Sequence, residues 1–168
     1  MIPENIDFRE LIEQNLDYVR RLVYGMLGNA GQVDDLVQEI FVRVIRGYST
    51  FKQESSFQTW VYRIATRVVY DDLEQRKNRP VLCPVDEEEV PAKQETPAQE
   101  LLRRERETVI RAALEKLSPP LRTTVVLYFF ESLSPEQIAA VEECTTATVY
   151  WRLHEAKKQL KGPLEKFL

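Results

Sequence analysis

Hydrophobic residues in the first half of the chain recur at three- and four-residue steps, which is the spacing of an amphipathic helix. One such pattern runs from Phe8 to Met26 and is broken by the GNAG stretch of residues 28–31. A second apolar face extends from Val33 to Ile45, and a polar loop follows it over residues 47–56. A third pattern runs from residue 57 to about residue 78, before Pro80. The first half therefore predicts three helices.

The next part of the chain also has helical spacing. A helix is expected from about Glu100 to Leu117, and the dipeptide Ser118-Pro119 follows it. A serine before a proline is typical of a helix start, because the hydroxyl caps the free amides and proline tolerates the first helical position. We therefore expect a new helix after Ser118, capped by its hydroxyl.

A second start signal stands at Ser134, which is followed by Pro135 and, three residues on, by Gln137. Serine with glutamine at this spacing forms a capping box. The pattern predicts a short helix over Glu136–Glu142, a turn at Cys144-Thr145, and a last helix that Thr145 or Thr146 caps. That helix is expected to reach about Leu160, where Gly162-Pro163 interrupts it. A short helix, a tight turn and a longer basic helix have the dimensions of a helix-turn-helix.

Residues 80–97 (PVLCPVDEEEVPAKQETP) separate the two helical parts. They contain four prolines and an acidic run with little apolar periodicity. Proline cannot continue a helix, and clustered like charges repel and extend a chain. We predict an all-α protein of two small helical domains, residues 1–79 and 99–168, joined by an acidic linker over residues 80–98.

Composition excludes several functional classes. Few glycines (five among 168 residues) favour helix over sheet. No apolar run has the roughly 18 residues of a membrane span, and the N-terminus lacks the pattern of a signal peptide, so we expect a cytoplasmic protein. Cys83 and Cys144 lie far apart, and His154 is the only histidine. We therefore expect no metal site, cofactor, small-molecule substrate or catalytic reaction.

Charge is distributed unevenly. The net charge of −4 argues at first against a nucleic-acid partner. Residues 1–79 carry 11 basic and 12 acidic side chains, residues 80–100 carry 1 and 6, and residues 101–168 carry 11 and 9. The acidity is therefore concentrated in the linker, and each helical part is left able to present a basic face.

Three segments, in this order, resemble the extracytoplasmic-function branch of the sigma-70 family. Residues 34–41 (DDLVQEIF) are similar to the family's D-x-x-Q-E-x-F helix. Residues 57–65 (FQTWVYRIA) are similar to its F-x-T-W-L-Y-R-I-A segment. Residues 133–139 (LSPEQIA), with 147–154 (ATVYWRLH), are similar to its helix-turn-helix. The resemblance covers nearly the whole chain, with a linker in the expected place.

The resemblance implies three sets of site residues. The first set docks on the clamp helices of RNA polymerase and comprises Asp34, Asp35, Gln38, Glu39 and Phe41. The second binds the minus-ten element, where the loop before the third helix receives a flipped base and a basic stripe contacts phosphates. It comprises Tyr48, Phe51, Lys52, Phe57, Trp60, Arg63, Arg67, Arg76 and Lys77. The third reads the minus-thirty-five element in the major groove. It comprises Thr146, Thr148, Tyr150, Trp151, Arg152, His154, Lys157 and Lys158.

Some positions depart from the family's pattern. Arg67 stands where the family usually has asparagine, and Glu143 stands where it usually has the glycine of the turn. Glu155 replaces a residue that is usually basic. The aromatic pair Tyr150-Trp151 replaces small or basic residues.

The resemblance implies a sigma factor that binds core RNA polymerase and promoter DNA, helps to open the promoter and is restrained by an anti-sigma protein. It also implies that the acidic linker, with Asp86–Glu89, threads toward the RNA-exit region of the polymerase. One alternative is a sigma-like adaptor that sequesters an anti-sigma protein without reading DNA. A second alternative is an ordinary helix-turn-helix repressor or activator, which does not require the two N-terminal motifs.

Overall fold

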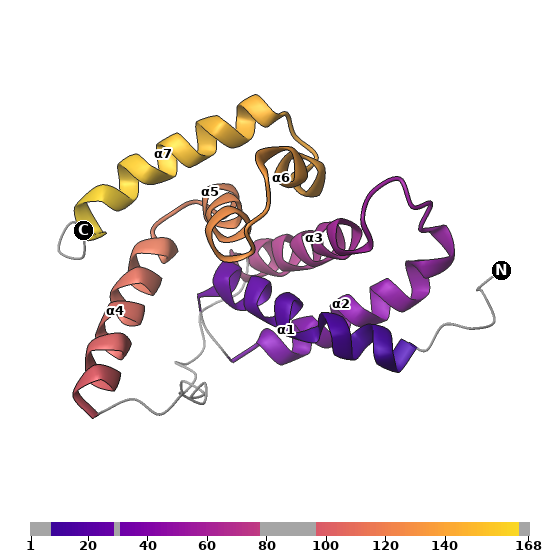
Figure 1. Cartoon of the computed structure of the whole chain (residues 1–168), viewed down its shortest axis with the longest axis horizontal. Helices are drawn as coiled ribbons and strands as arrows, with labels where there is room; N and C mark the ends of the chain where they lie inside the picture. The colour runs from indigo at the N-terminus through magenta and orange to yellow at the C-terminus, as the bar shows by residue number, and fades with distance from the viewer. Residues whose placement is uncertain (1–7, 29–30, 78–96, 165–168) are drawn as a thin grey trace.

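The computed structural model describes residues 8–28, 31–77 and 97–164, and within these ranges every regular element is a helix (Figure 1). The first half forms α1 (Phe8–Leu27), α2 (Val33–Gly47), the short 3-10 helix η1 (Tyr48–Thr50) and α3 (Phe57–Lys77). The three helices expected in the first half are therefore confirmed. None of the helices within these ranges combines the length and the apolar content of a membrane span.

The second half forms α4 (Pro97–Glu115), α5 (Pro119–Val125), the π-helical turn η2 (Val126–Phe130), α6 (Pro135–Glu142) and α7 (Thr146–Leu164). The helical fold class is confirmed by these elements. Residues 80–96 of the expected linker lie outside the described residues, and its last two residues begin α4.

Apolar periodicity explains how the first three helices pack. Each helix turns its apolar stripe toward the other two, and side chains such as Leu22, Ile40 and Val61 are fully buried. Burying one such side chain contributes about 1.5–3 kcal/mol. The helices are thus held by their apolar faces, and their polar faces remain available for other contacts.

Capping confirms one helix start and corrects another. At α6, the amide of Gln137 donates to the hydroxyl of Ser134 (3.3 Å), and the amide of Ser134 donates to the side chain of Gln137 (2.8 Å), so the capping box is present. At α5, Ser118 occupies the cap position, but its side chain accepts no cap hydrogen bond. Pro119 and Pro120 fill the first two positions, so Leu121 is the first residue of α5 with an amide that could donate to the hydroxyl, and that bond is not made.

The last helix differs from the prediction at its end. Gly162-Pro163 was expected to interrupt it, but α7 continues through Pro163 to Leu164. Proline removes one backbone hydrogen bond and crowds the preceding turn. Pro163 stands one residue from the end of α7 and is exposed, so little helical structure remains beyond it to be disrupted.

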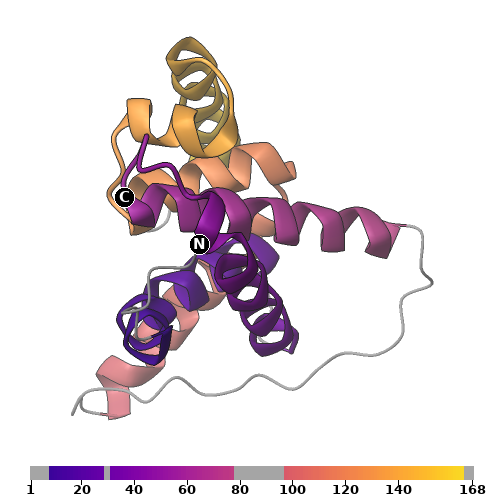
Figure 2. The same ribbon diagram turned by 90° about the vertical axis from the view of Figure 1, so that its right-hand side faces the viewer.

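α3 lies at the centre of the molecule. In both views α1 and α2 pack on one side of it, and α6 and α7 lie on the other (Figures 1 and 2). Buried residues of both halves, including Val23, Val69, Leu127 and Ile138, belong to one continuous apolar core. We call the interface of α1 and α3 with η2 and α6 the seam. The seam contains Arg21, Gly25, Tyr62, Arg63, Arg67 and Tyr70 on one side and Val126, Glu131, Ala140, Glu142 and Glu143 on the other.

Candidate nucleic-acid interface

The outer face of α2 is polar and exposed. Asp35 and Gln38 are exposed to solvent, and the carboxylates of Asp34 and Glu39 pair with Arg20 and Arg43. These ion pairs are themselves solvent-exposed, and pairs of this kind contribute little to stability. The face can therefore exchange its internal partners for those of another molecule at small cost.

Phe41 occupies a different position from the other four residues of its predicted set. Its side chain is only 5% exposed and belongs to the apolar core. It therefore holds α2 in place and presents no surface to a partner. The acidic and amide side chains of α2 remain as the surface that another protein can contact.

Four aromatic rings pack together where η1 leads into α3. The ring of Phe51 lies 5.1 Å from that of Trp60 and 5.7 Å from that of Phe57, and Tyr48 lies 6.0 Å from Phe57, all between centroids. The four side chains are half-buried, and Lys52 beside them is exposed. Offset or edge-to-face rings at such distances attract one another. The four sequence-predicted aromatic residues are thus brought together as a packed cluster, and the exposed Lys52 follows Phe51 in the chain.

Two arginines of α3 point at α6. Arg63 donates from Nε (3.2 Å) and Nη2 (2.9 Å) to the carbonyl oxygen of Ala140, and Arg67 donates from Nη2 to the carboxylate of Glu143 at 2.6 Å. Farther along, Arg76 pairs within the helix with Asp72 at 2.6 Å. The side chain of Lys77 lies outside the described residues. Three arginines of the expected basic stripe therefore already have hydrogen-bond or ion-pair partners within the chain.

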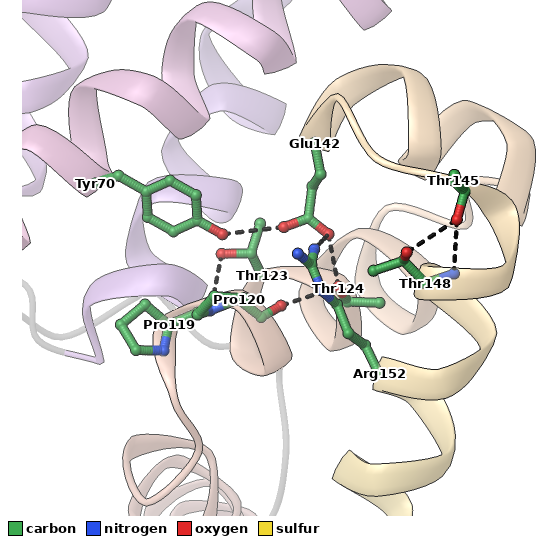
Figure 3. Close-up of polar contacts among 9 residues, drawn as sticks. All are labelled: Tyr70, Pro119, Pro120, Thr123, Thr124, Glu142, Thr145, Thr148 and Arg152. Carbon is green, nitrogen blue, oxygen red and sulfur yellow. Dashed lines mark hydrogen bonds and ion pairs between the residues drawn. The ribbon is translucent and has the colours of Figure 1, made fainter.

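Glu142 is the centre of a polar network that the sequence analysis did not identify (Figure 3). Its side chain is 2% exposed and accepts from the hydroxyls of Tyr70 (3.0 Å) and Thr124 (2.6 Å), while Arg152 pairs with it at 2.8 Å. Burial, together with the nearby charge of Glu142, raises the pKa of Tyr70, so this phenol remains a hydrogen-bond donor. The network joins α3, α5, α6 and α7.

One local signal pointed to this role of Glu142. It is the last residue of α6, where the helix dipole disfavours an acidic side chain. An acid at that position indicates a partner elsewhere in the fold. Arg152 is that partner within the C-terminal half, and its side chain is only 17% exposed. Arg152 is therefore directed at Glu142, whereas the sequence analysis assigned it to DNA.

α7 presents an exposed stripe along its outer face. Thr145 precedes α7 and caps it, because its hydroxyl accepts from the amide of Thr148 at 3.2 Å, and Thr146 and Thr148 are half-buried. The side chains that share full exposure lie at helical spacing, which places them on one face. They are Tyr150, Trp151, His154, Lys157 and Lys158. A helix with aromatic and basic groups on a free face is suited to a nucleic-acid groove.

Comparison with known families separates the two halves of the chain. Residues 11–79 match the family described as Sigma-70 region 2, and residues 107–160 match the family described as Sigma-70, region 4. Together these segments contain the polar face of α2, the aromatic cluster and the helix-turn-helix with the exposed stripe of α7.

Individual relatives agree with these family matches. The chain is 36% identical over 158 residues to the ECF RNA polymerase sigma factor SigE of Mycolicibacterium smegmatis, covering 94% of this chain and 61% of that protein. It is 31% identical to the RNA polymerase sigma-H factor of Pseudomonas aeruginosa, covering 88% and 80% of the two chains. The fold is similar, with a TM-score of 0.76 and 19% identity, to the sigma factor RpoE of Bartonella quintana solved in complex with the anti-sigma factor NepR, covering 95% and 97%.

Proposed function

The chain belongs to the extracytoplasmic-function group of the sigma-70 family, and we propose that it binds core RNA polymerase and directs that enzyme to a set of promoters. The observation that carries this proposal is the order of regions along one chain. A polymerase-binding helix, a minus-ten region and a helix-turn-helix follow one another, and each keeps side chains suited to its partner. No catalytic step of its own is part of the proposal, and its work takes place in the cytoplasm, where polymerase acts.

We assign polymerase binding to the outer face of α2. This face offers the carboxylate and amide groups of Asp34, Asp35, Gln38 and Glu39. The opposite face of α2 packs into the apolar core, which fixes the position of the helix. The polar face suits basic and amide groups on a large partner, since charge-assisted hydrogen bonds are stronger than neutral ones.

We assign the minus-ten element to the aromatic cluster and α3. Aromatic side chains can stack on an unpaired base, at about 1–3 kcal/mol per base, and the exposed Lys52, next to Phe51 in the chain, can contact a phosphate. Arg63, Arg67 and Arg76 supply further cations along the helix. Phosphate contacts of this kind make binding weaken as salt concentration rises.

We assign the minus-thirty-five element to the exposed stripe of α7. Lys157 and Lys158 supply positive charge, and Tyr150 and Trp151 supply apolar surface for base edges such as the thymine methyl group. Arg152 is left out of this surface, because it pairs with the buried Glu142.

An anti-sigma protein is proposed as a regulatory partner. The sigma-like adaptor remains the alternative from another class, and the net charge of −4 favours it. The free aromatic and basic side chains of α7 oppose it, because an adaptor that never contacts DNA does not need that stripe. They favour a chain that reads a promoter.

The test is transcription with purified components. The full chain is added to core RNA polymerase and fragmented genomic DNA of the source organism, and transcript starts are sequenced. We expect discrete starts that share an upstream two-part motif. The double variant Asp35→Ala/Gln38→Ala should lose core binding, while Glu105→Ala, at an exposed position on α4, should retain it. Core binding without specific starts would contradict promoter reading, and absence of core binding would favour the adaptor.

A further inference from the structure

The ion pair between Glu142 and Arg152 spans the turn of the helix-turn-helix (Figure 3). Glu142 is the last residue of α6, and Glu143 then turns the chain in the left-handed region, with φ 51° and ψ 44°. Arg152 lies in the N-terminal half of α7, and its Nη1 atom is 2.8 Å from the carboxylate of Glu142. The pair therefore joins the helix that we assign to promoter DNA to the helix before it.

Both side chains of this pair are largely withdrawn from solvent. The Nη1 atom of Arg152 is buried and makes no hydrogen bond within the part of the chain that the structure describes, so the charge of Glu142 holds this end of the side chain. Buried charges are costly to desolvate, and such a pair often stabilises a fold no better than apolar side chains of comparable volume. Stability alone therefore does not account for the pair.

The carboxylate oxygen that pairs with Arg152 also contacts a third helix. Oε2 of Glu142 accepts from the hydroxyl of Thr124 in α5 at 2.6 Å, so one oxygen connects α5, α6 and α7. The other oxygen, Oε1, accepts from the hydroxyl of Tyr70 in the N-terminal half. The contacts of Oε2 thus lie wholly within the C-terminal half and do not depend on the seam.

The apolar packing of α7 is divided at Arg152. Val149, three residues earlier, is fully buried in the large core, whereas Ala156, four residues later, belongs to a separate small cluster with Leu121 and Val125. Helical spacing places Val149, Arg152 and Ala156 on the same face of α7. Apolar contacts are non-directional, so they do not by themselves fix the rotation of a helix. Arg152 supplies the directed contact between the two clusters.

We propose that Glu142 is a positioning residue for promoter recognition. Through Arg152 it fixes the rotation of α7, and it thereby determines which side chains of α7 face the base edges of the minus-thirty-five element. The inference rests on the function proposed above, because it concerns how α7 reads that element. Neither Glu142 nor Arg152 contacts DNA in this role.

The rotation of α7 matters because successive side chains on a helix point about 100° apart. Trp151 precedes Arg152, and His154 follows it by two residues, so fixing Arg152 on the inner face holds these two on the exposed face. Contacts with base edges tolerate errors of only about 0.5 Å and 10–20°. Lys157 and Lys158 depend less on direction, since an ammonium group acts as a point charge. A loosely held α7 should therefore lose base preference before it loses affinity for the DNA backbone.

The test replaces the pair without leaving a buried charge. Glu142→Met/Arg152→Met puts apolar side chains of comparable volume at both positions, so the double variant is expected to fold and to unfold at a urea concentration close to that of wild type. Glu142→Gln keeps the side-chain shape and removes the negative charge. Two controls separate other roles: Tyr70→Phe removes only the hydrogen bond across the seam, and Lys158→Ala removes one exposed cation of α7.

The measurement is transcription by the full chain in complex with core RNA polymerase, on a pool of templates. Each template carries one start found in the transcription test, with its upstream element randomised, and the transcripts are sequenced. The wild-type complex should prefer the best base about ten-fold or more at contacted positions, the range of a typical mismatch. In the double variant and in Glu142→Gln this preference should fall at least about five-fold. Preference at the downstream element should not change.

The controls define what counts against the inference. Tyr70→Phe should keep the wild-type preferences, and Lys158→Ala should reduce transcription from all templates alike, as loss of a phosphate contact does. A double variant as stable as wild type that keeps the wild-type preferences would overturn the inference, and so would an equal loss in Tyr70→Phe. Should the double variant fail to fold, Glu142→Gln decides in the same way. A wild-type complex without any preference at the upstream element would instead refute the proposed function, and this inference with it.

Discussion

Arg122 offers a quantitative test of how the two halves are joined. Its guanidinium group is buried and donates to four carbonyl oxygens: Leu114 at 2.9 Å, Glu115 at 2.7 Å, Leu117 at 3.3 Å and Met26 at 2.9 Å. The first two acceptors belong to the last turn of α4, and Met26 belongs to the last turn of α1. Carbonyls in a last helical turn have no partner within their helix, although that of Leu114 also accepts from the amide of Leu117 at 3.0 Å. One arginine thus donates hydrogen bonds to the C-terminal ends of two helices, one from each half of the chain.

The perturbation is Arg122→Met, which retains most of the side-chain volume and removes all the donors. Burial lowers the pKa of Arg122, but an arginine remains charged at any ordinary pH. A hydrogen bond from a charged group contributes about 1.5–3 kcal/mol, and a buried acceptor left unpaired costs about 1–3 kcal/mol. Allowing for the desolvation that the apolar variant avoids, we expect the free energy of unfolding to fall by about 3–5 kcal/mol.

The assay is urea denaturation followed by far-UV circular dichroism. Arg122→Lys keeps the charge without the planar fork, so it should lose an intermediate amount. Arg106→Met, at an exposed position on α4, should change stability by less than about 0.5 kcal/mol. A loss below about 1 kcal/mol for Arg122→Met would refute the reasoning, because water would then satisfy the carbonyls of Glu115, Leu117 and Met26 equally well.

Three further outcomes are expected. Ser134→Ala should lower the free energy of unfolding by about 1 kcal/mol through loss of the capping box. Ser118→Ala should lower it less, because that hydroxyl makes no cap bond. Thermal melts of the two variants measure the difference. Asp35→Ala should leave stability within about 0.5 kcal/mol and still weaken capture of core polymerase in a pull-down. Burial raises the pKa of Tyr62 and Tyr70, so above pH about 10 these tyrosines ionise in the unfolded chain before they do in the folded chain. The free energy of unfolding should therefore fall as pH rises, which urea midpoints on either side of pH about 10, with phenolate absorbance, will show.

The sequence predicted those elements whose signals are local. Apolar periodicity located α1, α2 and α3, and the capping box located the start of α6. Glycine and proline were less reliable near the end of α7, where a proline in a final exposed turn has little helix to break. The sequence pattern was therefore sufficient for features that depend on interactions between residues close together in the chain.

The seam could not be predicted in the same way. Arg67 and Glu143 were each noted as departures from the family pattern, but nothing in their spacing, 76 residues apart, showed that they meet. The same holds for Gly25 with Val126 and for Glu142, whose partners lie on other helices. These contacts depend on how finished helices dock, and docking leaves no periodic trace in the sequence.

The left-handed conformation of Glu143 also has a genetic consequence. Each glutamate codon becomes a glycine codon through one base change, and glycine is the residue that this backbone favours. A chain without the contact between Arg67 and Glu143 is therefore a single mutation away, and that mutation places at position 143 the residue that tolerates a left-handed backbone best.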